Sequence, residues 1–417
     1  MNHIFHLPVE ILIGIYQSLS DIDDVLHFAR TCRYLNSIFD PVEARLRIFR
    51  SVIRNAPQHA YETELYERVQ LFGLFSEKFY SASPVQQVAA SRARFLAGHA
   101  NHPEMVRSSN TIPAAAVWEI LCRWQGMRLL FDLFCDSCVQ ESYSVSGFPC
   151  LPLDEEDWVA LAGEDTLPAP SRSSHAILDE VDAEQKQRSY QRFYKALTAH
   201  WTAVEALWLG RAQVYTTSKQ CDKSFGLVWT KWTNNPDRPL EEKIDLVEVV
   251  DFVWGFLGRK CFPVSSVPAW LEGEREETMQ EYLDDNGTVA SNWPFFVQRV
   301  IQYLRPPQVI ELLLSMWKLH DDQNLDRPTY LQRLGFSDVF EGIIEGEDRW
   351  VSTDTWFPIT VVESDVENGL YYMEDGPSLV AKWDYYRRVM WPSDARTKVL
   401  FRNESGQELV ERITAKV

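Results

Sequence analysis

Residues 7–35 read LPVEILIGIYQSLSDIDDVLHFARTCRYL, and this spacing predicts two short amphipathic helices in succession. Proline is favoured in the first turn of a helix, so Pro8 indicates where the first helix begins. Glu10 follows and places negative charge near the positive end of the helix dipole. The apolar residues of this helix recur at four-residue spacing, with two more alongside, and form one stripe: Ile11, Ile15, Leu19, Leu12 and Tyr16.

Two further helices are expected directly afterwards. Ser20-Asp21-Ile22-Asp23 matches a capping box, and the apolar positions behind it are Ile22, Val25, Leu26, Ala29 and Cys32. Asp40-Pro41-Val42-Glu43 opens another helix, whose apolar positions are Leu46, Phe49 and Ile53. Three or four such short helices cannot bury much surface by themselves. Part of their apolar surface must therefore meet either the rest of the chain or a partner.

The pattern Leu7-Pro8-x-Glu10-Ile11-Leu12-x-x-Ile15-x-x-x-Leu19, followed by Asp24-Val25-Leu26-x-x-Ala29-x-x-Cys32-Arg33-x-Leu35, resembles an F-box. It is similar to the version found at the extreme N-terminus in large fungal families. The resemblance implies a three-helix unit at residues 1–50 that binds a Skp-type adaptor, which bridges to a cullin-RING scaffold. Carried over by position, Leu7 and Pro8 contact the adaptor. Six further residues supply the apolar seam or its support: Ile11, Leu12, Ile15, Leu19, Leu26 and Cys32. Which of them face outward is left open by the sequence.

The composition is that of an acidic globular protein long enough for two or three domains, with 417 residues and 45% hydrophobic residues. A net charge of −19 disfavours binding to nucleic acid or to an anionic membrane surface, although it permits a basic protein partner. No apolar run of roughly 18 residues predicts a membrane span, and no signal peptide is recognised. Seven scattered cysteines suit a reducing compartment, so the cytoplasm or the nucleus is expected.

The remainder of the chain, residues 51–417, shows no repeat of 20–50 residues and is expected to be one large irregular helical domain. Helical patterns occur near residues 65–79, 83–96, 117–134, 182–213, 239–257, 294–305, 308–320 and 377–391. Residues 147–176 are rich in Pro, Ser, Asp and Glu and indicate a loop or an internal boundary. Three late stretches have strand-like composition, namely 356–362, 369–372 and 399–401. The fold class is therefore predicted to be mainly α, with a small β element near the C-terminus.

Several groups of residues could in principle carry chemistry, but each has a more ordinary interpretation. Cys135-Asp136-Ser137-Cys138, with Cys122 and Cys150, offers four thiols to zinc, yet a second C-x-x-C is missing. Cys122 and Cys135 lie on an apolar helical pattern, where a free cysteine packs as a small hydrophobe. His99 and His102 with Glu104 lack the spacing of a known metal motif and are expected to be solvated.

The acidic runs are expected to be solvated faces or helix starts, and they are Asp154-Glu155-Glu156-Asp157, Asp284-Asp285, Asp321-Asp322 and Glu345 with Glu347-Asp348. No catalytic, cofactor-binding or metal-binding residue is predicted. The many tryptophans between Trp201 and Trp391 should mostly be core residues, with a minority lining a recognition groove.

These features together favour a non-catalytic substrate adaptor of a Skp-cullin-F-box ubiquitin ligase, with a protein substrate bound by residues 51–417. Two alternatives stay open at this point. One is an F-box protein that acts outside a ligase as a structural interaction protein. The other is an enzyme with an unrecognised active site in the C-terminal domain.

Overall fold

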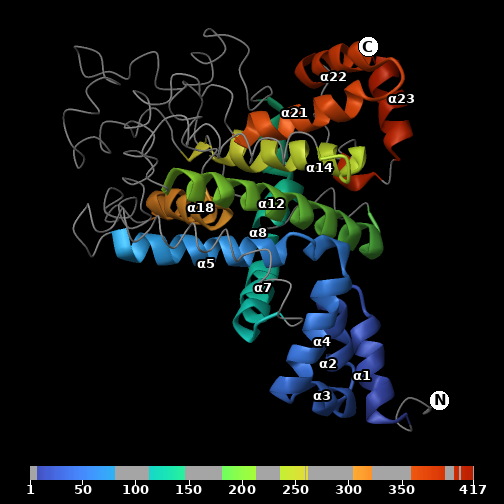
Figure 1. Ribbon diagram of the computed structural model, residues 1–417, viewed down its shortest axis with the longest axis vertical. Coiled ribbons are helices and arrows are strands. Elements are labelled where there is room, and N and C mark those ends of the chain that lie inside the picture. The colour runs from blue at the N-terminus through green and yellow to red at the C-terminus, as the bar shows by residue number, and fades with distance from the viewer. Residues whose placement is uncertain are drawn as a thin grey trace. The chain divides into compact units, whose positions relative to one another are not determined.

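The computed structural model describes residues 7–79, 112–145, 181–212, 235–258, 260–261, 304–321, 358–389, 399–402 and 405–416. Every regular element in these ranges is a helix, and no strand occurs among them (Figure 1). The mainly α fold class is therefore confirmed. In the described residues, no helix is both long enough and apolar enough to cross a membrane.

The chain divides into two compact units, the first formed by Met1–Gly126 with Ala212–Val214 and the second by Met127–Arg211 with Tyr215–Val417. The boundary expected after residue 50 stays a prediction. The loop expected at residues 147–176 and the helix expected at 83–96 lie outside the described residues.

The first unit begins with the short helices that the sequence predicts. Its elements are α1 (Val9–Ser18), α2 (Ile22–Arg30), α3 (Arg33–Phe39), α4 (Val42–Asn55), η2 (Pro57–His59), α5 (Glu62–Phe79) and α7 (Ala114–Gly126). The helices α1 and α4 lie side by side, and α3 packs against both. The helices α1 and α2 confirm the two helices expected to begin near Pro8 and at Ser20-Asp21-Ile22-Asp23. The helices α4 and α5 confirm those expected at residues 42–53 and 65–79.

The caps of α2 and α3 explain why the chain turns where it does. The side chain of Asp21 accepts a hydrogen bond from the backbone N–H of Asp23 at 2.7 Å, so the N-cap of α2 is Asp21. The sequence pattern had pointed to Ser20, one residue too early. The Sγ of Cys32 accepts from the backbone N–H of Leu35 at 3.5 Å and caps α3.

An aromatic cluster lies in the core formed by α1, α2, α3 and α4. Tyr16 is completely buried, and its ring lies against Phe28 and Phe39. Its hydroxyl donates a hydrogen bond to the carbonyl of Leu35 at 3.1 Å. Burial, with a smaller contribution from Cys32, raises the pKa of Tyr16 to about 12, so the phenol stays protonated and keeps donating. Leu12 is equally buried beside it.

The helix α7 belongs to this first unit although it lies sixty residues further along the chain. Trp124 Nε1 donates to one carboxylate oxygen of Asp23, and Gln125 Nε2 donates to the other, both at 3.0 Å. Arg123 is buried and forms an ion pair with Glu62 of α5, whose side chain is completely covered. Because a buried ion pair is costly to break, these contacts hold α7 firmly against α2 and α5.

The second unit is also helical. Its elements are α8 (Arg128–Cys135), α9 (Ser137–Val145), α12 (Ala183–Ala212), α14 (Leu240–Val250), the π-helix η3 (Asp251–Gly258), α18 (Pro306–Asp321), α21 (Pro358–Tyr371), α22 (Gly376–Val389), η8 (Val399–Phe401) and α23 (Gly406–Lys416). Helices expected near 182–213, 239–257, 308–320 and 377–391 are confirmed. The single helix expected over 117–134 is instead two, α7 and α8, and most of the one expected at 294–305 lies outside the described residues.

The expected β element is wrong wherever the structure describes it. Residues 358–371 form α21, and Val399–Phe401 form one turn of 3₁₀-helix. The physical reason is visible in the packing, because Val362, Val366 and Leu370 recur every four residues and are all buried. One buried helical face therefore outweighs the strand preference of the β-branched residues in 359–362.

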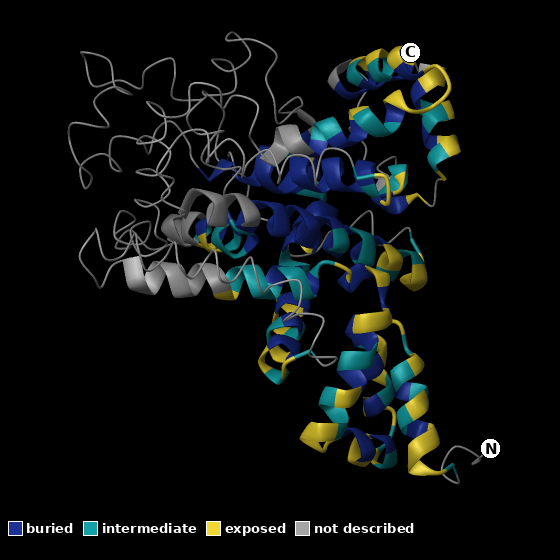
Figure 2. Cartoon of the chain, viewed as in Figure 1, coloured by how far each residue is buried: buried dark blue, intermediate teal, exposed yellow. Residues whose placement is uncertain are grey.

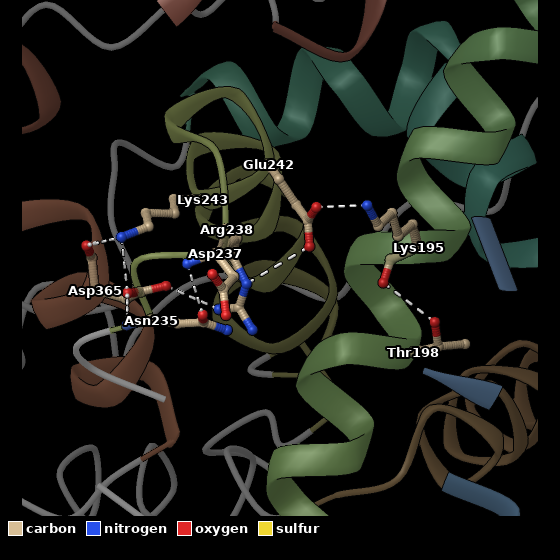
Figure 3. A network of polar contacts seen from close by, with 8 residues as sticks. All are labelled: Lys195, Thr198, Asn235, Asp237, Arg238, Glu242, Lys243 and Asp365. Carbon is tan, nitrogen blue, oxygen red and sulfur yellow. Dashed lines mark hydrogen bonds and ion pairs between the residues drawn. The ribbon is translucent and has the colours of Figure 1, made fainter. Parts of the chain in front are cut away.

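A buried ionic network joins α14 to α21 in the second unit (Figure 3). Asp365 is completely covered, and its carboxylate accepts from Arg238 Nη1 at 2.8 Å and from Lys243 Nζ at 3.0 Å. The backbone N–H of Asn235 donates to the same carboxylate at 3.3 Å. Both cations are themselves nearly covered, and Glu242 supplies a second carboxylate 3.5 Å from Arg238 Nε, so each buried cation has a carboxylate partner.

The described tryptophans of this unit agree with the expected core role. Trp201, Trp254 and Trp383 are buried, and Trp254 Nε1 donates to the carbonyl of Leu304 at 2.7 Å. Trp317 is half-buried. The side chains of the other tryptophans between Trp201 and Trp391 lie outside the described part of the chain.

Candidate docking surface

The eight residues that the sequence singles out for adaptor binding occupy three different environments. Leu12 is completely buried in the core of the first unit. Pro8 is exposed, and Ile11 is 52% exposed. The remaining five are half-buried: Leu7, Ile15, Leu19, Leu26 and Cys32. The structure therefore assigns Leu12 to support of the fold and leaves Pro8 and Ile11 accessible to a partner.

The start of α1 shows how these residues come to face solvent. Pro8 is the N-cap of the helix, and its carbonyl accepts the backbone N–H groups of Ile11 at 3.0 Å and of Leu12 at 3.2 Å. The proline ring needs no N–H there, so it can start the helix without an unsatisfied donor. Figure 2 shows this end of α1, next to the N-terminus, as exposed.

Two further exposed apolar residues were missed by sequence reasoning. Val9 is 43% exposed on α1, and Val42 is 53% exposed on α4. Val42 precedes Leu46 by four residues, so the periodicity of the third helix contained a signal for it. Val9 had no such signal, because an isolated surface valine is ordinary in a soluble protein.

The apolar residues of α1 therefore fall into an exposed set and a buried set. Leu12 and Tyr16 close the core, while Pro8, Val9 and Ile11 remain at the surface. Val42 is also exposed, on α4, a helix that packs against α1. Exposed apolar side chains on adjacent helices are typical of a surface that a partner covers.

The cysteines, histidines and acidic runs that could in principle carry chemistry form no metal site among the described residues. Cys135 is buried, and burial first, then nearby carboxylates, raises the pKa of its thiol well above the ordinary value, which makes it a poor nucleophile. Cys138 is half-buried and Cys122 is exposed. Among the described residues, no group of three His, Cys, Asp or Glu side chains could hold a metal ion. Cys150, His99, His102, Glu104 and most of the acidic runs lie outside those residues.

Comparison with known families agrees with this part of the molecule. Residues 4–51 match the F-box-like family. The chain thus carries an F-box-like domain at its N-terminus, as an F-box protein does. F-box domains bind Skp-type adaptors. No curated protein and no solved structure matches the chain.

Proposed function

We propose that this chain is a non-catalytic, substrate-recruiting subunit of a Skp-cullin-F-box ubiquitin ligase. In this role the F-box-like unit docks on the Skp-type adaptor, and the helical remainder presents a protein substrate. Holding the substrate close to the ubiquitin-conjugating enzyme raises the effective concentration of its lysines, so positioning is the whole mechanism. Such a ligase subunit would work in the cytoplasm or the nucleus.

One observation carries the proposal: apolar residues remain exposed on α1 and α4 above a core that is already closed. Ile11 and Val42 are each more than half exposed, whereas Leu12, which follows Ile11 in the chain, is completely covered. A helix-in-groove interface takes most of its energy from a few such apolar anchors. The match of residues 4–51 to the F-box-like family supports a Skp-type adaptor as the partner of these residues.

The proposal is tested by co-expressing the full chain with a Skp-type adaptor, followed by size-exclusion chromatography. The wild-type chain should co-elute with the adaptor, and a cullin scaffold added afterwards should join the same peak. Leu7→Ala together with Pro8→Ala should abolish co-elution while leaving the far-UV circular dichroism unchanged, because both residues lie at the outer end of α1. Tyr372→Ala serves as the control, since it removes an aromatic ring that is 74% exposed in the other compact unit.

Each failure of this experiment has a distinct meaning. A wild-type chain that does not bind the adaptor would refute the docking role altogether. Undiminished binding by the Leu7→Ala, Pro8→Ala chain would refute the assignment of these two residues. Binding of the adaptor without recruitment of the cullin would contradict the ligase role and favour an F-box protein that acts outside a ligase.

A further inference from the structure

The F-box-like match ends at residue 51, but the folded unit to which it belongs continues to α7. The helix α7 packs beside α4, as Figure 1 shows. Arg50 of α4 fixes the start of α7 by donating from Nε to the carbonyl of Ile112 at 2.7 Å. Together with the bonds of Trp124 and Gln125 to Asp23, this ties both ends of α7 to the F-box-like helices.

The outer side of α7 carries an unusual residue for a solvent-facing position. Trp118 is 36% exposed, and the guanidinium carbon of Arg45 on α4 lies 5.8 Å from the centre of its ring. This distance places the pair within the range of a cation–π contact. The Nε of Arg45 is buried and has no hydrogen-bond acceptor in the described part of the chain.

The charge of α4 is opposite to that of the whole protein. This helix has four arginines and one glutamate, a net charge of +3, in a chain whose net charge is −19. Arg45 and Arg47 form no ion pair with any described residue. A basic helix in an acidic protein indicates that its surface meets an acidic partner, because opposite charges speed association and fix its register.

Val42 connects this region to the docking surface described above. It lies three residues before Arg45, and residues at this spacing are neighbours on a helix surface. The set Val42, Arg45 and Trp118, here called the α4–α7 face, therefore lies on two helices of the same unit, and α4 also packs against α1.

We infer that the adaptor-binding surface does not end with the F-box-like segment but continues across the α4–α7 face onto Trp118. This inference rests on the proposed docking of a Skp-type adaptor. The adaptor would contribute an apolar side chain that packs on Val42 and Trp118, flanked by a carboxylate that pairs with Arg45. Tryptophan and arginine are the residues most often found as interface anchors, which fits the composition of this face.

The test measures the affinity of the full chain for a purified Skp-type adaptor by isothermal titration calorimetry. Trp118→Ala should weaken binding about tenfold, a typical loss for an interface tryptophan. Arg45→Glu should weaken it further and reduce the dependence of the affinity on salt concentration, because one ion pair becomes a repulsion. Tyr372→Ala, an aromatic truncation in the other unit, should bind as tightly as the wild type.

A second variant guards against a folding artefact, since Trp118→Ala could disturb α7. Val42→Ser changes a side chain that is 53% exposed and should leave the fold intact while still weakening binding at least threefold. If Trp118→Ala and Arg45→Glu bind with wild-type affinity while Val42→Ser binds more weakly and Leu7→Ala, Pro8→Ala does not bind, the inference is wrong and the proposed function stands. If the wild-type chain itself fails to bind the adaptor, the proposed function falls and this inference with it. A face that instead mediates pairing of two copies of the chain, seen as a dimer that Trp118→Ala abolishes without changing adaptor affinity, would also overturn the inference.

Discussion

Two neighbouring residues of α1 should respond to the same substitution in opposite ways. Leu12→Ala removes a side chain with no exposed surface, and such a change in a closed core costs about 2–5 kcal/mol of unfolding free energy. Ile11→Ala removes a side chain that is already 52% exposed, so only about 1 kcal/mol of burial is lost. Alanine is also the better helix former by up to about 0.5 kcal/mol. The net loss of stability for Ile11→Ala is therefore below about 1 kcal/mol.

Adaptor binding should show the reverse order once stability is taken into account. Ile11→Ala should weaken the affinity for a Skp-type adaptor about tenfold, because an apolar anchor is truncated at the interface. Leu12→Ala should bind with nearly wild-type affinity at low temperature, where enough of the unit remains folded, and should lose binding on warming as the unit unfolds.

Stability is best measured by hydrogen exchange of peptides from α1 and α4, since two compact units need not unfold as one cooperative transition. Gly14→Ala gives a useful calibration, because its position is open and the change should raise the local opening free energy by about 1 kcal/mol. The division between core and docking residues is refuted if Ile11→Ala destabilises the unit as much as Leu12→Ala does. It is also refuted if a stable Ile11→Ala chain binds the adaptor like the wild type.

Two further predictions concern stability. Burial lowers the pKa of His59 to about 3, against a smaller opposing effect of Asp23. The contribution of His59 to folding stability is therefore complete above its unfolded pKa of about 6.5, and it is lost as the pH falls below that value. At pH 5 the stability lost in this way is about 2 kcal/mol, and His59→Gln should remove that part of the pH dependence measured by hydrogen exchange of α4. Glu67, whose raised pKa of about 7 acts in the opposite sense, is present in both the wild type and the variant. Equal pH dependences of the two proteins would contradict the prediction. Asp365→Asn removes the buried carboxylate that pairs with Lys243 and Arg238, and leaves Glu242, at 3.5 Å, as a partner of Arg238. Protection of α14 and α21 should therefore fall by about 3–5 kcal/mol, whereas unchanged protection would show that the network does not stabilise the unit.

The sequence was most informative where local chemistry alone decides the structure. The helix starts at Pro8 and Pro41 follow from the fixed backbone angle of proline, and the start at Asp21 lies one residue after the cap expected at Ser20, because such signals act within a few residues. Which side of a helix is buried was harder to predict from the sequence, because α1 has apolar residues on more than one side. Its stripe contained both Ile11 and Leu12, and only packing against other helices shows that the second is core and the first is surface.

The remaining errors have tertiary causes. The strand expected at residues 356–362 rested on a short β-branched run, whereas the buried period of Val362, Val366 and Leu370 extends over a longer window. The pairing of Trp124 with Asp23 could not be foreseen, because it joins residues that are a hundred positions apart. The exposed Trp118 was equally hidden, since its significance comes from Arg45 on another helix.

The distribution of charge gives a reason for a docking unit that differs from the rest of the chain. Residues 1–55 contain six acidic and six basic residues, so the entire net charge of −19 resides in residues 56–417. An acidic partner would be repelled by that remainder and would approach the neutral unit, where α4 is positive. Because Leu12 and Tyr16 are the residues that α1 contributes to the buried core, the exposed residues of α1 and α4 are free to be matched to the partner. If electrostatic attraction guides docking, raising the salt concentration should clearly lower the association rate constant of the wild-type chain for the adaptor. The same rate constant of the Arg45→Glu chain should fall only slightly.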